Sequence, residues 1–187
     1  MSIDQILDRI YPVPDCSKQR IKTYISETQF PKGKVLLRAN KVEKSIYFIK
    51  QGIVRAYSNP VDKEITFWFG KEGDTIISMK SYVANQKGYE DIEALEKCEL
   101  YELKIEDLRR LFNDDIHIAN WGRRFAEQEL IRTERRLISR QFQTATERYR
   151  ELLEDHPDLI QRVQLRHIAS YLGITQVSLS RIRADIK

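Results

Sequence analysis

Two short amphipathic segments near the end of the chain constrain the fold more than any other feature. They flank a glycine and a threonine, Gly173 and Thr175. At a period of 3.6 residues, Ile168 and Leu172 share one face of the first segment. A glycine directly after the last apolar residue is the usual left-handed end of a helix, and a threonine two residues later can cap the next helix. Residues 165–183 are therefore predicted to form a helix, a tight turn and a second helix.

The second of these helices has two distinct faces. Leu179 and Ile182 lie on its apolar side, while Ser180 and Arg181 lie on the opposite side. An arginine can donate to guanine O6 and N7 in the major groove, and hydroxyls suit phosphates and base edges. The spacing is that of a helix-turn-helix, so DNA binding is predicted; an ordinary helical hairpin is the alternative. The predicted DNA contacts are a base-reading Arg181 and, around it, Arg166, Thr175, Gln176, Val177, Ser178, Ser180, Arg183 and Lys187.

Charge is unevenly distributed along the 187 residues. The net charge is +4, and residues 121–187 hold 13 Lys and Arg against 9 Asp and Glu, which leaves 19 of each sign in residues 1–120. The whole excess therefore lies in the C-terminal third. A neutral body joined to a basic helical end suits a phosphate-binding module attached to a sensing or assembly module.

The composition excludes several classes of protein. No run approaches the roughly 20 apolar residues of a membrane span. Acids stand among the first residues, where a secretion signal needs basic and then apolar ones, so a cytoplasmic protein is predicted. Cys16 and Cys98 form no CxxC and are interpreted as buried thiols, and His117, His156 and His167 as surface or capping residues. Since no catalytic grouping, metal-ligand spacing or phosphate-cradling glycine loop appears, no enzyme, catalytic residue or metal site is predicted.

The N-terminal part of the chain has the pattern of two helices followed by short strands. Residues 2–11, with a Ser2–Gln5 capping box, and residues 15–25 are predicted helices. From Phe30 onwards, runs rich in valine, isoleucine and aromatics are separated by glycine turns, which favours a sandwich or barrel. The second and third runs, joined through Gly52, are predicted to form a hairpin. The predicted strands are residues 35–38, 46–50, 53–57, 64–69, 75–78, 90–94 and 99–103.

A long helix is predicted after the strands. Residues 105–112 are predicted to form a short helix, and Asp114-Asp115 can begin the long one. Apolar residues recur along it at intervals of about seven, which suits two helices packed along their length. Covering the sheet of the same chain is the alternative, and both can hold at different ends of the helix. A Thr144–Glu147 capping box starts a new helix, so residues 1–113, 114–143 and 144–187 are predicted as three parts. The apolar residues are Ile118, Trp121, Phe125, Leu130, Ile131, Leu137, Ile138, Ala145 and Leu152.

This order of elements resembles the cyclic-AMP receptor protein/Fnr family of bacterial transcription regulators, over nearly the whole chain. The best-matching segments are YFIKQGIVR at residues 47–55, Gly73-Asp74, IASYLGIT at residues 168–175 and LSRI at residues 179–182. Residues 152–172 look especially like the Bacteroidetes-type branch. The resemblance implies an α+β fold with an N-terminal antiparallel β-roll of the cyclic-nucleotide-binding jelly-roll type as effector domain, a long dimerisation helix and a C-terminal helix-turn-helix domain. It also implies a homodimer that reads a palindromic operator.

The segments that hold cyclic AMP in nucleotide-binding members of the family differ in this chain. Those members use a Gly-Glu-Leu segment, whose glutamate meets the ribose, and an Arg-Ser-Ala segment, whose arginine pairs with the phosphate. The candidate effector pocket of this chain instead has Ser78, Met79 and Lys80 at the first place and Glu90 and Asp91 at the second. Two carboxylates would repel a phosphate, so cyclic AMP is not expected. No cofactor is predicted, and the effector stays unknown.

The leading hypothesis is a dimeric, sequence-specific DNA-binding transcription regulator. Double-stranded DNA and a second copy of the chain are the expected partners, RNA polymerase is a third candidate, and no membrane is expected. Relatives of the branch carry a glutamate and a basic residue where this chain has Val177 and Ala184, and no β-wing follows Lys187. These departures favour the alternative, a ligand-binding or protein-interaction module with a vestigial helix-turn-helix.

Overall fold

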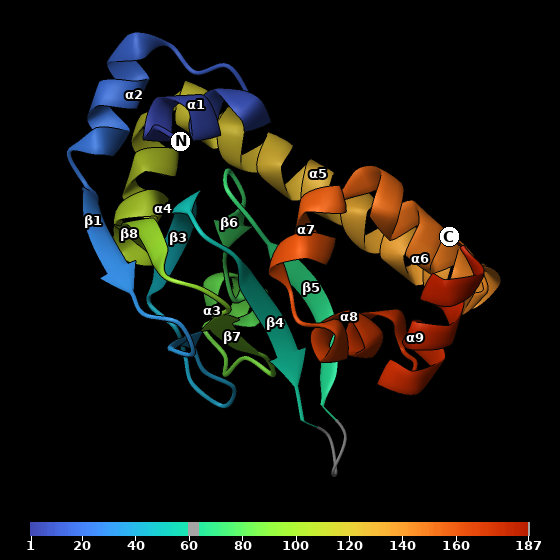
Figure 1. The fold of residues 1–187 in the computed structure, drawn as a ribbon. Coiled ribbons are helices and arrows are strands. Elements are labelled where there is room, and N and C mark those ends of the chain that lie inside the picture. The colour runs from blue at the N-terminus through green and yellow to red at the C-terminus, as the bar shows by residue number, and fades with distance from the viewer. Residues whose placement is uncertain (60–63, 187) are drawn as a thin grey trace.

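Two antiparallel sheets form the body of the computed structural model, which describes residues 1–59 and 64–186. One sheet has the strand order β1-β8-β3-β6 and the other β2-β7-β4-β5, with helices around them (Figure 1). The predicted succession of antiparallel strands and C-terminal helices is confirmed. Within the described residues, the strands are β1 (Ile25–Phe30), β2 (Val35–Leu37), β3 (Ser45–Gln51), β4 (Val54–Ser58), β5 (Ile65–Gly70), β6 (Thr75–Ile76), β7 (Asp91–Ala94) and β8 (Cys98–Lys104).

The predicted hairpin is wrong, because β3 and β4 belong to different sheets. β3 pairs with β6 and β8, whereas β4 pairs with β5 and β7. Consecutive residues of β3 are buried, so both of its faces are covered. Its apolar pattern therefore does not indicate which strand pairs with it. Gly52 makes the corner between the sheets with φ +111°, and a Cβ there would lie 2.6 Å from Cys98 Sγ.

The elements that the sequence does not predict include β1 and α3. Helix α2 (Asp15–Lys22) ends at Lys22 rather than at residue 25, and β1 then pairs with β8 along its whole length. Helix α3 (Met79–Ala84) begins directly after the segment predicted as a strand, with Ser78 of that segment as its N-cap, and β6 has only two residues. Both errors concern segments whose structure depends on pairing with distant parts of the chain.

The first sheet packs against α1 (Ile3–Ile10), α4 (Ile105–Asp114) and the beginning of α5 (Ile116–Phe142). Trp121 lies in this core, and its indole N–H donates to the carbonyl of Leu7 at 3.1 Å. The capping box of α1 and the Asp115 cap of α5 are confirmed. A second core fills the space between the two sheets, where it contains Leu37, Ile49, Val54, Ile76, Ile92 and Leu100.

The helices after α5 form a third cluster of buried residues. They are α6 (Ala145–Asp155), α7 (Pro157–Arg162), α8 (Leu165–Leu172) and α9 (Gln176–Asp185). The predicted break before Thr144 is confirmed, because the Thr144 side chain and the Glu147 carboxylate form a capping box at the start of α6. Leu152, Ile168 and Leu179 are buried in this cluster, and Ile53 from the strand region packs with them.

The C-terminal helices rest on β5, the edge strand of the second sheet. Ser170 of α8 donates its hydroxyl proton to the Glu64 carbonyl at 2.9 Å and accepts from the Thr66 N–H at 2.8 Å. Arg162 of α7 pairs with Glu72 at 2.7 Å. Burial alone would raise the pKa of Glu72, but hydrogen bonds from Arg162 and from the Gly52 N–H lower its pKa to about 2. The edge strand is thereby covered by helices (Figure 1).

Candidate nucleic-acid interface and effector pocket

The turn between α8 and α9 has the geometry that the sequence predicts. Gly173 ends α8 with φ +74° and ψ 25°, the left-handed conformation that favours glycine. A Cβ at Gly173 would have no heavy atom within 4 Å, so its conformation alone accounts for the glycine. Thr175 caps α9 by accepting from the Ser178 N–H at 3.1 Å. The predicted helix, turn and helix are confirmed.

One side of α9 faces solvent and carries most of the predicted DNA contacts. Thr175, Gln176, Val177, Ser180 and Arg181 are exposed, while Leu179 on the opposite side is fully buried. The hydroxyls on this surface already have partners within the motif, because Ser180 donates to the Gln176 carbonyl at 3.0 Å and the Thr175 and Ser178 hydroxyls bond each other at 2.9 Å. Arg181 is thus the long, exposed charged side chain of this surface.

The other predicted DNA contacts lie at the margins of this surface. Arg166 is exposed on α8, and its Nε donates to His167 Nε2 at 3.4 Å. Arg183 is half-buried, and Ser178 is partly covered by its place in the cap. Lys187 lies outside the described residues.

A buried ion-pair network packs against α8. Arg55 is almost fully buried, donates to Glu93 at 2.5 Å and to Thr66 at 3.2 Å, and also pairs with Glu64. The Arg55 hydrogen bond holds the pKa of Glu64 below its usual range. His167 packs against the network, where burial and the Arg55 charge lower its pKa. No local sequence pattern marks this network. Arg55, Thr66 and Glu93 lie on three different strands, and His167 lies on a distant helix.

His167 and Cys16 differ from their predicted environments. His167 is buried rather than on the surface, because α8 is pressed against β5. Cys16 is exposed rather than buried, whereas Cys98 is buried as predicted. Cys16 lies in the first turn of α2, where the buried residues are Ser17 and Ile21.

The predicted effector residues divide into two groups. Ser78 and Glu90 are buried next to each other, because a Cβ added to Gly88 would lie 2.7 Å from Ser78 Oγ and 3.4 Å from the Glu90 carboxylate oxygens. Glu90 accepts from the Tyr89 N–H at 3.0 Å. Asp91 instead accepts from the Ala39 N–H at 3.0 Å, and Met79 and Lys80 are exposed on α3. The structure thus brings the Ser78 hydroxyl and the Glu90 carboxylate together.

Met79 lines a separate cavity of about 260 Å³. Its walls come from β3, α3, α4 and α5, and they include Ile46, Tyr82, Phe112 and Trp121. The lining is mostly apolar, and Gly122 allows the wall to close, because a Cβ there would lie 2.3 Å from Phe112 Cζ. The sequence does not reveal this cavity, since it depends on the position of the unpredicted helix α3.

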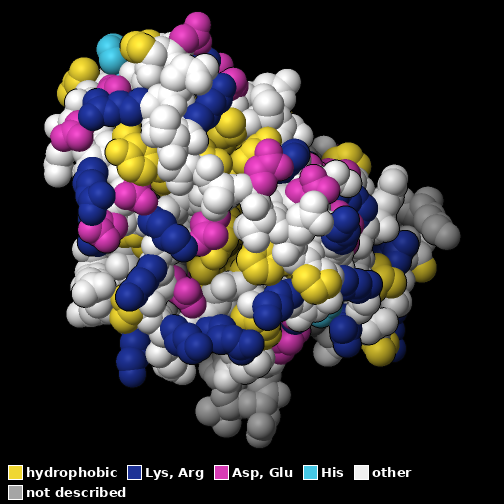
Figure 2. All heavy atoms as spheres, turned by 90° about the vertical axis from the view of Figure 1, so that its left-hand side faces the viewer, with side chains coloured by type: hydrophobic (Ala, Val, Ile, Leu, Met, Phe, Trp, Pro, Cys, Tyr) yellow, Lys and Arg dark blue, Asp and Glu magenta, His cyan; other side chains and the backbone are white. Residues whose placement is uncertain are grey.

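Charge on the face that carries β1 and α2 is mixed. Lys and Arg side chains are interspersed there with Asp and Glu (Figure 2). Ion pairs account for part of this pattern, with Lys18–Asp8 at 2.7 Å, Lys22–Asp4 at 2.6 Å and Lys50–Glu27 at 2.8 Å. This balance agrees with the even charge count of residues 1–120.

Comparison with known proteins gives a family match over part of the chain and a shared fold over most of it. Residues 27–115 match the family described as "Cyclic nucleotide-binding domain". FixK2 from Bradyrhizobium japonicum is similar in structure, with a TM-score of 0.77 and 21% identity over 87% of this chain and 84% of that chain. A putative transcriptional regulator of the Crp/Fnr family from Eubacterium rectale has a TM-score of 0.73 and 16% identity over 93% and 85% of the two chains. The catabolite activator protein of Thermus thermophilus has a TM-score of 0.62 and 18% identity over 97% and 86%.

These similarities extend over the sheets and the C-terminal helices alike. The chain therefore shares the fold of these three proteins, one of which is described as a regulator of the Crp/Fnr family, and no finding separates out the Bacteroidetes-type branch. No curated protein matches the sequence significantly. Among the described residues, no helix is both long and apolar enough to cross a bilayer, and no three His, Cys, Asp or Glu side chains converge as a metal site would require.

Proposed function

We propose that this protein is a dimeric, sequence-specific DNA-binding transcription regulator whose α8–turn–α9 unit is a helix-turn-helix. The observation that carries the proposal is the exposed side of α9, with Arg181 projecting from a helix whose other side is anchored by Leu179. A recognition helix needs such a free surface to enter the major groove. Residues 1–113, 114–143 and 144–187 then act as sensor, dimerisation helix and DNA-binding domain.

The dimer in this proposal forms through the second half of α5. Ile118 and Trp121, in the first half, are buried in the core of the same chain. Leu130, Ile131, Leu137, Ile138 and Phe142, in the second half, are large apolar residues on the surface. Exposed apolar residues at intervals of seven suit a helix packed against an identical helix. In this proposal, the first half of α5 covers the sheet of its own chain and the second half packs against the partner helix, which are the two predicted roles of the apolar residues.

We expect that Arg181→Ala lowers affinity for a bound promoter site by about tenfold per half-site, because a bidentate contact to guanine is lost. Selectivity over random DNA should fall as well. A mobility-shift titration at several salt concentrations measures both, and the parent protein should bind more weakly as salt rises, because phosphate contacts release counterions.

The matched control is Arg110→Ala, which removes the same charge from an exposed arginine on α4 that pairs with Glu106. It should bind like the parent. If the parent and the Arg181→Ala protein bind with equal affinity and selectivity, Arg181 does not read bases.

We also expect cyclic AMP and cyclic GMP to give no binding heat at micromolar protein. The Glu90 carboxylate, buried beside Ser78, would face the phosphate of the nucleotide at short range, and like charges in a buried site repel strongly. Isothermal titration calorimetry measures this, with injection into buffer as the blank. Glu90→Gln removes the charge at nearly constant shape, so any gain in binding should appear in that variant first. Tight binding to the parent protein would contradict the assignment.

The second candidate is a ligand-binding or protein-interaction module with a vestigial helix-turn-helix. It is favoured by the exposed Val177 and Ala184, which offer α9 no charge or hydrogen bond for DNA. The two functions differ in the same mobility-shift experiment: absent or salt-insensitive DNA binding by an intact dimer would favour the module.

A further inference from the structure

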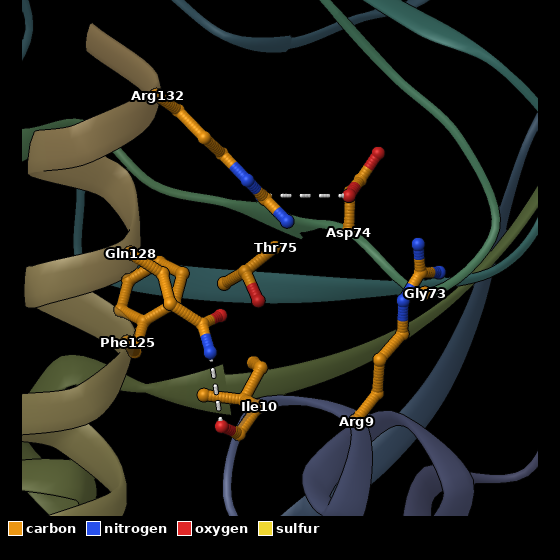
Figure 3. Close-up of a pocket in the computed structure, with 8 residues that line it drawn as sticks. All are labelled: Arg9, Ile10, Gly73, Asp74, Thr75, Phe125, Gln128 and Arg132. Carbon is orange, nitrogen blue, oxygen red and sulfur yellow. Dashed lines mark hydrogen bonds and ion pairs between the residues drawn. The ribbon is translucent and has the colours of Figure 1, made fainter. Parts of the chain in front are cut away.

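A small cavity lies where α1, the turn before β6 and α5 meet. It encloses about 50 Å³ and is lined by Arg9 and Ile10 of α1, by residues 73–75, and by Phe125, Gln128 and Arg132 of α5 (Figure 3). A single water molecule needs roughly 10–15 Å³ of such space, so the cavity can hold several waters or one small polyatomic ion. It shares Phe125 with the apolar cavity, and neither Ser78 nor Glu90 lines it.

The Thr75 hydroxyl is buried at this cavity and has no hydrogen-bond partner within residues 1–59 and 64–186. Thr75 is only 9% exposed, and its Oγ1 has no hydrogen bond to any described residue. In Figure 3 its side chain lies between Arg132, Gln128 and Arg9, and the hydroxyl points into the space they enclose. A buried hydroxyl without a partner loses its hydration free energy, so such groups are usually bonded to something in the cavity.

Two guanidinium groups reach the cavity from opposite sides. Arg9 donates to the Glu72 carbonyl at 3.3 Å, and Gly73 allows this approach, because a Cβ there would lie 2.6 Å from Arg9 Nη1. Arg132 Nη1 lies 2.7 Å from a Glu129 oxygen and 3.8 Å from Asp74 Oδ1. Each guanidinium has five N–H donors, so both retain donors beyond these contacts.

We propose that this cavity binds a small oxyanion, a phosphate or a carboxylate group. Its lining holds two arginines and one carboxylate, that of Asp74, while the Glu129 carboxylate pairs with Arg132 from outside the lining. Guanidinium groups match the oxygen geometry of phosphates and carboxylates, and the Thr75 hydroxyl supplies a further donor. Asp74 accepts from the Lys71 N–H at 2.9 Å and stays in the site, so its repulsion keeps the affinity modest.

Bound anion would tie together three elements that are distant in the sequence. Because it binds the folded protein and not the unfolded chain, it should raise the melting temperature progressively as the anion concentration rises above its Kd. The first experiment therefore measures thermal unfolding of the full chain with inorganic phosphate, with acetate, and with sodium chloride at the same ionic strength. We expect phosphate or acetate to stabilise the protein beyond chloride, and the better of the two identifies the preferred group. Equal curves in all three salts would overturn the proposal.

Variants then locate the site. Arg132→Gln and Arg9→Gln should each weaken binding of the stabilising anion by about tenfold, since a charge-assisted hydrogen bond is lost. Arg135→Gln, on an exposed part of α5 outside the cavity, is the matched control and should bind like the parent. Arg181→Ala should also keep the binding, because Arg181 does not line this cavity. Loss of binding in Arg181→Ala alone would assign the anion to the DNA surface and refute the site.

Thr75→Val distinguishes a ligand contact from a structural role. Valine has nearly the same shape and removes an unpaired hydroxyl, so without added anion this variant should be at least as stable as the parent. With anion it should show weaker binding. A destabilised variant that binds the anion normally would show that the hydroxyl serves the fold and not a ligand.

Discussion

Replacing Leu130 and Leu137 together by glutamate is expected to make the protein monomeric and to lower its affinity for a palindromic site by about 10²–10⁴-fold, the range gained by linking two binding modules. The two leucines are seven residues apart on α5 and are 71% and 59% exposed in the single chain. Glutamates at these positions would face their own copies across a helix pair, where like charges repel.

The stability of the single chain should hardly change, because surface substitutions without buried contacts usually have small effects. Analytical ultracentrifugation measures the assembly state, and a mobility shift measures DNA affinity. Val83→Glu on α3 is a suitable control, since it places the same charge on another exposed apolar residue that the proposed dimer does not use. A parent protein that sediments as a monomer at micromolar concentration would contradict the proposed dimer directly.

Replacing Trp121 by alanine is expected to lower the free energy of unfolding by about 3–5 kcal/mol. Trp121 is 2% exposed, its ring lies 5.8 Å from Phe125 and 5.9 Å from Phe48 between centroids, and its N–H bonds the Leu7 carbonyl. Alanine removes the ring and leaves this carbonyl without its donor. The loss should be large because Trp121 joins α1, β3 and α5 at one point.

Urea denaturation of the parent and the variant measures the difference. Trp121→Phe keeps most of the apolar volume and removes the N–H, so it should cost less than alanine. Leu137→Ala, on the exposed part of the same helix, should change stability by no more than about 0.5 kcal/mol as a monomer. A Trp121→Ala protein with nearly parental stability would mean that α5 does not pack on the sheet as described.

Features determined by neighbouring residues could be predicted from the sequence. The Ser2–Gln5 and Thr144–Glu147 capping boxes and the Gly173 helix end each depend on residues within one or two turns of each other. These signals located the helix ends and the turn before α9. The exposed side of α9 also followed from its periodicity, because one buried residue, Leu179, fixes the orientation of the whole helix.

Features determined by distant residues could not be predicted in the same way. β3 is buried on both faces, so its sequence does not distinguish the hairpin with β4 from the actual pairing with β8. The oxyanion cavity combines Arg9 with Arg132, and the ion-pair network combines Arg55 with Glu93. No local spacing relates such partners, and only the packed fold brings them together.

The contact between Ser170 and β5 has a consequence for any shortened form of the protein. Ser170 occupies a backbone donor and acceptor that an edge strand would otherwise offer to another chain. A fragment ending before α6 would uncover this edge together with Ile53 and Phe69, which pack against the helices. Such a fragment would expose an unpaired edge strand that can pair with other copies in solution. In the full chain, α8 covers this edge and is expected to limit self-association of the second sheet.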